Sequence, residues 1–158
     1  MLNGHLILTG EIGSGKSTLL LKKLNKWISD GLKIAGWITP SHFSNNVKDG
    51  YDMMIFSDSK LIRTMTFIRD KKFPKSFKWK RWWISQDAFD TIACFDFGKA
   101  DQFVIDEVGP LELEDKKGCR AQLPLIYSRY KNTITVVRQS CLDLFRAEFG
   151  PMQSVSLS

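Results

Sequence analysis

Gly10-Glu11-Ile12-Gly13-Ser14-Gly15-Lys16-Ser17 is the stretch that decides the fold. It has the spacing G-x-x-x-x-G-K-[ST] of a phosphate-binding loop (P-loop), and it stands between a short apolar run and a segment with helical periodicity. Glycines let such a loop turn tightly enough to aim successive backbone N–H groups at an anion, and the dipole of the following helix strengthens the attraction. The sequence therefore predicts a phosphate site formed by Gly10, Glu11, Ile12, Gly13, Ser14, Gly15, Lys16 and Ser17.

Two side chains at the end of this loop have separate predicted roles. Lys16 can reach the terminal phosphates of a nucleotide, so we expect it to act in binding and in catalysis. The Ser17 hydroxyl can coordinate Mg²⁺, which makes Mg²⁺ the expected cofactor and Ser17 one of its ligands.

Composition limits the class of protein. The chain has 158 residues, of which 43% are hydrophobic, and this fits one domain spanning residues 1–158. It has no apolar run long enough to cross a membrane and no signal pattern at its start, and its three cysteines show no C-x-x-C spacing. We therefore expect a cytoplasmic protein with reduced thiols. The net charge of +6 suits a polyanionic ligand, but nucleotides and nucleic acids both qualify.

Apolar runs alternate with helical patterns along the chain. Strands are predicted at residues 5–9, 33–39, 102–107, 133–137 and 152–157, and helices at residues 17–30, 86–98, 115–130 and 140–149. Residues 51–57 and 61–68 favour an antiparallel hairpin, and the polar residues 40–50 favour a loop. This alternation predicts a three-layer α/β fold with a mainly parallel sheet, to which the antiparallel hairpin is added.

Two acids follow the apolar run 102–105. Such a run is typical of a buried parallel strand that delivers carboxylates to its C-terminal edge. Asp106 is where a P-loop protein places the carboxylate that holds Mg²⁺, so Asp106 and Ser17 form the predicted metal site. Its neighbour Glu107 is well placed to orient and deprotonate a water in line with the terminal phosphate.

The chain resembles a known family in four segments: Gly10 to Ser17, Gly36-Trp37-Ile38-Thr39, Gly50-Tyr51-Asp52, and Val104 to Leu113. Within the last, D-E-V-G-P-L-E-L matches the family pattern D-E-[IV]-G-x-[ML]-E-[LF]. The resemblance is to the THEP-type nucleoside-triphosphatases, first described in thermophiles, whose vertebrate member is called cancer-related nucleoside-triphosphatase. It implies a RecA-like P-loop domain and Mg²⁺-dependent hydrolysis of ATP, GTP and other nucleoside triphosphates with broad base tolerance. Glu107 would act on the water, and Gly109 would lie in the nucleotide site.

The chain departs from the family pattern at two places. Members usually carry T-E-E-[VI]-R after the second strand, whereas this chain reads Thr39-Pro40-Ser41-His42-Phe43. In the following G-x-R-x-G-[FY] turn, Lys48 replaces the arginine, and a lysine cannot make the same bidentate contact. Any role that those acids and that arginine have near the phosphates would therefore change.

Two more residues have open interpretations. Arg138 follows the strand predicted at residues 133–137, so it is either a catalytic residue that neutralises the terminal phosphate or an ordinary surface arginine. Glu112 either supports the site from nearby or is an acid that favours the start of a helix.

Residues 71–83 alternate six cations with five aromatic rings. This pattern fits a surface that follows a phosphate backbone while its rings stack on bases. It also fits a partly buried β-segment whose rings fill the core and whose lysines stay in water, and we favour this second interpretation.

Two other functions remain alternatives to the hydrolase. A P-loop kinase would transfer the phosphoryl group to a nucleoside or nucleotide, but such enzymes usually need an arginine-rich lid and the arginines here are scattered. A nucleotide-gated module would use residues 71–83 to bind RNA or DNA. The expected partner is thus a nucleoside triphosphate, with nucleic acid as the less favoured one.

Overall fold

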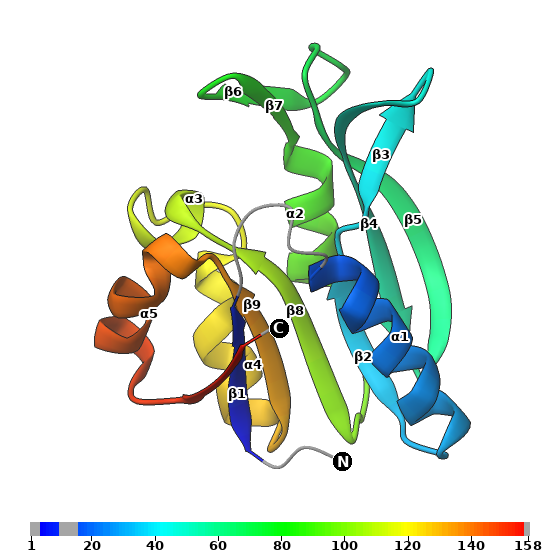
Figure 1. Ribbon diagram of the computed structural model, residues 1–158, viewed down its shortest axis with the longest axis vertical. Helices are drawn as coiled ribbons and strands as arrows, with labels where there is room; N and C mark the ends of the chain where they lie inside the picture. Colours follow the sequence, from blue (N-terminus) through cyan, green and yellow to red (C-terminus); the bar gives the residue numbers. More distant parts are fainter. Residues whose placement is uncertain (1–3, 10–15, 157–158) are drawn as a thin grey trace.

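The computed structural model describes residues 4–9 and 16–156 (Figure 1). Within these residues ten strands form one sheet in the order β10-β1-β9-β8-β2-β4-β5-β7-β6, with β3 paired to β4. The strands are β1 (His5–Thr9), β2 (Ile34–Ile38), β3 (Ser41–Ser44), β4 (Val47–Ser57), β5 (Lys60–Arg69), β6 (Ser76–Trp79), β7 (Trp82–Ser85), β8 (Gln102–Val108), β9 (Thr133–Val137) and β10 (Gln153–Ser156). The helices are α1 (Lys16–Ser29), α2 (Gln86–Cys94), α3 (Pro110–Leu113), α4 (Leu123–Arg129) and α5 (Leu142–Phe149), with 3₁₀ turns η1 (Arg120–Gln122) and η2 (Gln139–Cys141).

The parallel part of the sheet consists of β10, β1, β9, β8 and β2. Every residue of β2 and β9 is buried, as expected of strands covered on both faces. Because the strands are parallel, their carboxyl ends meet at one edge, which is also where α1 begins (Figure 1). The predicted order of strands and helices is confirmed for this part of the chain.

The antiparallel part is larger than the predicted hairpin. The β4–β5 hairpin is present, and it is extended by β7 and β6 on one side and by β3 on the other. The prediction of a loop over residues 40–50 was wrong, because β3 and the start of β4 occupy it. Asn45 and Asn46 join these strands with φ angles of 51° and 64°, which suit the two-residue turn that matches strand twist.

The prediction of a helix over residues 115–130 was also wrong, because the helix that forms is shorter. Only η1 and α4 form there, and α4 carries a proline in its first turn. Gly118 has a φ of 61°, which breaks the helical path before it. Proline lacks an N–H and is tolerated at a helix start, so Pro124 marks where this helix begins.

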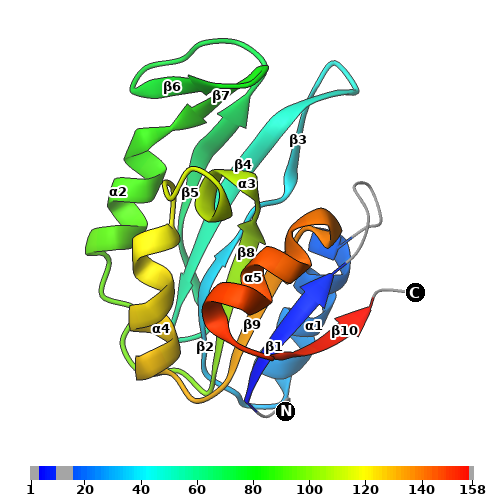
Figure 2. The same cartoon turned by 90° about the vertical axis from the view of Figure 1, so that its left-hand side faces the viewer.

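Helices cover both faces of the sheet, which confirms the three-layer α/β fold (Figure 2). On one face, α1 contributes Leu20, Leu24 and Trp27 to a cluster that includes Val104 of β8. On the other face, α2, α4 and α5 pack on a larger cluster around Phe103 and other rings. Among residues 4–9 and 16–156, no helix has the length and apolar character needed to span a membrane.

Gly36 permits the close contact between β2 and β8. Its φ is +125°, and a Cβ added there would overlap the carbonyl oxygen of Val104 and lie 2.7 Å from the Val104 nitrogen. The backbones therefore approach more closely than any side chain allows. Since β8 carries Asp106 and β2 leads into Thr39, this contact positions the site described below.

We predict that Gly36→Ala lowers the free energy of unfolding by at least about 3 kcal/mol, because it adds backbone strain to overpacking. Urea denaturation followed by circular dichroism would measure the change. Gly98→Ala is the matched control, since Gly98 also has a positive φ but has nothing within 4 Å of an added Cβ. It should cost only about 1 kcal/mol. Equal losses in both variants would contradict the role given to the β2–β8 contact.

Candidate active site

The predicted site residues come from three parts of the chain that meet at the carboxyl edge of the sheet. Lys16 and Ser17 begin α1, Asp106 and Glu107 lie near the end of β8, and Arg138 follows β9. The Ser17 hydroxyl lies 3.3 Å from Asp106 Oδ2, so the start of α1 and the tip of β8 are in direct contact. The other residues of the predicted loop, Gly10, Glu11, Ile12, Gly13, Ser14 and Gly15, lie outside the described residues, so their role stays a prediction.

Asp106 is a buried carboxylate, with 2% of its surface exposed. Its Oδ2 accepts a hydrogen bond from the Thr39 backbone N–H at 2.9 Å and the weaker one from Ser17. The indole N–H of Trp37 donates to its backbone carbonyl at 3.3 Å. These bonds hold the side chain between α1 and the end of β2.

The second oxygen of this carboxylate is left without a partner. Asp106 Oδ1 and Thr39 Oγ1 are both buried and make no hydrogen bond within the described part of the chain. Burial raises the pKa of Asp106 above its usual value, and the negative charge of Glu107 raises it further. A hard cation would satisfy these oxygens and stabilise the ionised carboxylate, so the residues present fit such an ion.

Glu107 lies at an irregularity in the sheet. The register between β8 and β9 shifts between Ile105 and Val108, and Glu107 has a φ of 67°. Positive φ is uncommon for a residue with a side chain, and β-bulges often re-aim side chains next to active sites. The bulge interrupts the regular alternation of side chains along β8. Asp106 and Glu107 can therefore both serve the site at the carboxyl edge of the sheet.

Arg138 lies against Glu107. Its Nε donates to Glu107 Oε1 at 3.1 Å, and its backbone N–H donates to the Val108 carbonyl at 3.2 Å. The side chains of Arg138 and Glu107 are 34% and 26% exposed. A Cβ on Gly109 would lie 3.5 Å from Arg138 Nε, so the arginine passes close over this glycine. Its geometry places Arg138 in the site, while its catalytic role stays a prediction.

Glu112 supports the turn that follows Glu107. Its Oε1 accepts the Gly109 backbone N–H at 3.1 Å, and the residue is 4% exposed. Burial raises its pKa to about 7, with a further contribution from the charge of Glu107. A Cβ on Gly118 would overlap Glu112 Oε2, so the backbone at Gly118 packs closely on this carboxyl group. Of the two interpretations of Glu112, support of the site is therefore the one that its contacts favour.

Thr39 and Trp37 are site residues that the sequence did not single out as such. Both bind Asp106, one through its backbone and one through its indole. The signal was available in the segment Gly36-Trp37-Ile38-Thr39, which ends a buried strand next to β8. Lys48, in contrast, donates to the Tyr51 hydroxyl at 2.7 Å and lies over the Tyr51 ring. These two contacts account for it without a phosphate.

Comparison with known proteins agrees with this geometry. A family model described as NTPase matches residues 5–156. Nucleoside-triphosphatase THEP1 of Saccharolobus solfataricus is 27% identical over 113 residues, which cover 70% of this chain and 62% of that protein. The protein of the same name from Korarchaeum cryptofilum is 28% identical over 116 residues, covering 70% and 56%. The matched part of the chain thus spans about three fifths of the length of these two relatives.

Two solved structures have a similar fold. The solution structure of a human cancer-related nucleoside triphosphatase aligns with a TM-score of 0.68 and 18% identity, covering 98% of this chain and 89% of that one. The crystal structure of THEP1 from Aquifex aeolicus gives 0.63 and 18%, covering 98% and 90%. These matches confirm the P-loop NTPase fold. Because the family model matches nearly the whole chain, the protein belongs to the NTPase family, and its resemblance to the THEP type is confirmed.

Proposed function

We propose that the protein is a Mg²⁺-dependent nucleoside-triphosphatase that hydrolyses ATP, GTP and other nucleoside triphosphates to the diphosphate and phosphate. One observation carries the proposal: Asp106 accepts the Ser17 hydroxyl on Oδ2 while its Oδ1 has no partner among the described residues, and a second acid follows directly on a bulge. The names of the relatives, which are nucleoside-triphosphatases, support the same reaction.

Ser17 and Asp106 would hold the Mg²⁺. When bound, the ion neutralises charge on the phosphate oxygens as the terminal bond breaks. The protein contributes the position of the two ligands, because Thr39 and Trp37 bind Asp106 and fix the direction of its free oxygen. Lys16, one residue before Ser17, would bind the terminal phosphates.

Glu107 would orient the attacking water and accept its proton. A general base must reach the water directly, and a carboxylate at a strand tip can do so. In the structure its Oε1 is occupied by Arg138. A triphosphate would offer the guanidinium a stronger negative partner, so binding of the substrate would draw Arg138 away and leave Glu107 able to accept a proton.

A kinase remains the alternative reaction. A kinase must exclude water from the terminal phosphate, whereas the position next to Asp106 holds a carboxylate suited to activating water. The relatives are also named as triphosphatases. Incubation with labelled triphosphate and a panel of nucleosides separates the two reactions: we expect inorganic phosphate, while a phosphorylated nucleoside would identify a kinase.

We predict that Glu107→Gln reduces kcat for phosphate release at least about 100-fold while the affinity for nucleotide changes little, because the amide keeps the shape but cannot accept the proton. Phosphate release and equilibrium binding of a fluorescent ATP analogue would be measured together. Lys16→Ala is the companion variant and should lose binding itself. If Glu107→Gln lost binding and turnover together, Glu107 would not be the base.

We predict that Arg138→Ala lowers kcat by about 100-fold, since it removes a charge from the transition state and a partner from Glu107. Arg138→Lys keeps the charge but not the planar geometry, and it should recover only part of the rate. Steady-state kinetics of both variants with ATP and Mg²⁺ would test this. An unchanged kcat in Arg138→Ala would show that Arg138 is an ordinary surface residue.

We predict that Glu112 makes the folded protein less stable as pH rises from about 4.5 to 7. Its carboxyl stays protonated to about pH 7 when folded, but it ionises near 4.5 when unfolded. The folded state therefore binds more protons in this window, and the free energy of unfolding falls by about 3 kcal/mol as pH rises through it. Urea unfolding at both ends of the window should show a weaker pH dependence for Glu112→Gln. Equal pH dependence would mean that Glu112 is ionised in the fold.

A further inference from the structure

Strands β6 and β7 form a two-stranded ribbon with two different faces. In its register Phe77 faces Ile84 and Trp79 faces Trp82. Phe77, Trp79 and Trp82 all pack on the larger core cluster. Core packing thus explains three of the rings in residues 71–83, as the favoured sequence interpretation proposed.

Core packing does not explain the side chains on the opposite face of the ribbon. Trp83 pairs with Lys78 in the register, so both point away from the core side. Within the described residues Trp83 belongs to neither core cluster. Lys72 Nζ and Lys78 Nζ lie 5.6 and 5.9 Å from the centre of its ring. A half-buried tryptophan between two lysines therefore stands on the outer face.

The cations of this segment carry positive charge that no ion pair within the described residues takes up. Residues 71–83 contain Lys71, Lys72, Lys75, Lys78, Lys80 and Arg81 and no acid. All six are exposed, and none of them forms an ion pair with a carboxylate in the part of the chain that the structure describes. Lys80 Nζ lies 4.6 Å from the centre of the Trp79 ring, and Arg81 Cζ lies 4.1 Å from that of Trp82. The ribbon and the residues before it thus combine exposed positive charge with aromatic faces.

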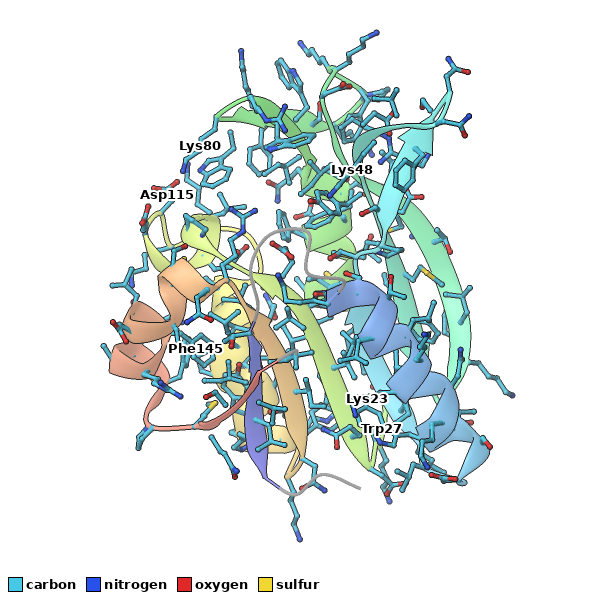
Figure 3. The ribbon with its side chains drawn as sticks, viewed as in Figure 1. Lys23, Trp27, Lys48, Lys80, Asp115 and Phe145 are labelled. Atoms are coloured by element: carbon cyan, nitrogen blue, oxygen red, sulfur yellow. The ribbon has the colours of Figure 1, made fainter. Side chains whose placement is uncertain are left out.

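The ribbon contacts two segments near the active site: the one that follows α3, and the start of the β3–β4 hairpin that follows β2. The indole N–H of Trp79 donates to Asp115 at 2.7 Å, and Asp115 follows α3, the helix after Glu107. The Trp82 ring packs at 6.3 Å on Tyr51, which pairs with Ser41 just after β2. Figure 3 shows Lys80 next to Asp115, with Lys48 at the same end of the molecule.

A hollow of about 900 Å³ continues this surface. It is lined by Lys75, which precedes β6, by Lys78 of β6 and by Lys117 of the loop after α3, and Asp87 and Asp90 of α2 form part of its wall. The lysines extend the line of cations from the outer face toward the segment that follows the active site.

We propose that the outer face of the β6–β7 ribbon binds single-stranded nucleic acid. Its lysines would contact the phosphate backbone, and Trp83 would stack on an unpaired base. A duplex hides the faces of its bases, so Trp83 would gain nothing from it. An acidic protein segment would pair with the lysines, but it would offer no base for the Trp83 ring to stack on. Single-stranded RNA or DNA uses both features at once.

The experiment measures binding directly, without nucleotide, and so does not depend on the proposed hydrolysis. Fluorescence anisotropy would follow a labelled oligo-deoxythymidine of about 20 nucleotides, and an oligo-uridine of the same length, as salt rises. We expect affinity to fall steeply with salt, since each phosphate contact contributes about −0.7 to the slope of log K against log salt concentration. Lys72→Glu with Lys78→Glu should weaken binding at least about tenfold and flatten the slope by about 1.4, the share of two phosphate contacts.

Trp83→Ala should weaken binding at least about fivefold, the lower end of what one lost base stack costs. The matched control is Lys22→Glu with Lys60→Glu, which makes the same charge change at two exposed lysines outside the ribbon. This control should bind nearly as well as the unmodified protein. Circular dichroism melts would check each variant, and the lysine pair decides the test if Trp83→Ala unfolds, because both lysines are exposed.

Several results would overturn the proposal. One is an absence of binding, or an affinity that salt does not change. Another is an equal loss in the control pair, which would mean that only net charge matters. A duplex of the same length that binds as tightly would remove the role of stacking. Poly-glutamate that binds as tightly as the oligonucleotides would point to an acidic protein partner in place of nucleic acid.

Discussion

The structure depends on how one buried carboxylate is held. Asp106 is nearly inaccessible, and an ionised acid without partners is costly to bury. Its hydrogen bonds come from the end of β2 and the start of α1, so both must stand at fixed positions relative to β8. The contact of Gly36 with Val104 sets the distance between the two strands. The positions of α1, β2 and β8 around the site are therefore set by the hydrogen bonds to Asp106 and by the close contact at Gly36.

A second constraint acts on the residues after Asp106. The bulge at Glu107 gives β8 a turn that a regular strand lacks, and Glu112 closes it by binding the Gly109 N–H. Arg138 then crosses over Gly109 to reach Glu107. The segment D-E-V-G-P-L-E-L is therefore specific for a physical reason: Glu112 at the helix start binds Gly109, and Arg138 joins the position of this glycine to Glu107.

The sequence predicted what short-range patterns can encode. The parallel strands were found because burial on both faces requires continuous apolar runs, and Asp106 because it ends such a run. The β3–β4 turn was missed because Asn45 and Asn46 look like loop residues when their φ angles are unknown. The sequence contained Arg138 as a candidate and Thr39 in a family segment, but the hydrogen bonds that they make could not be predicted, since these join residues far apart in sequence. The resemblance to the THEP type was confirmed because the pattern around Glu107 is specific.

The antiparallel strands connect the catalytic edge to a surface with different chemistry. β4 pairs directly with β2, and β5 carries the ribbon through its pairing with β7. The inner rings of the ribbon join the core that also contains Val108 of β8, so the ribbon is packed as part of the domain. The outer face of the ribbon does not pack on this core. It carries lysines and a tryptophan that belong to neither core cluster. Side chains that do not fill the core are the ones most available for a partner.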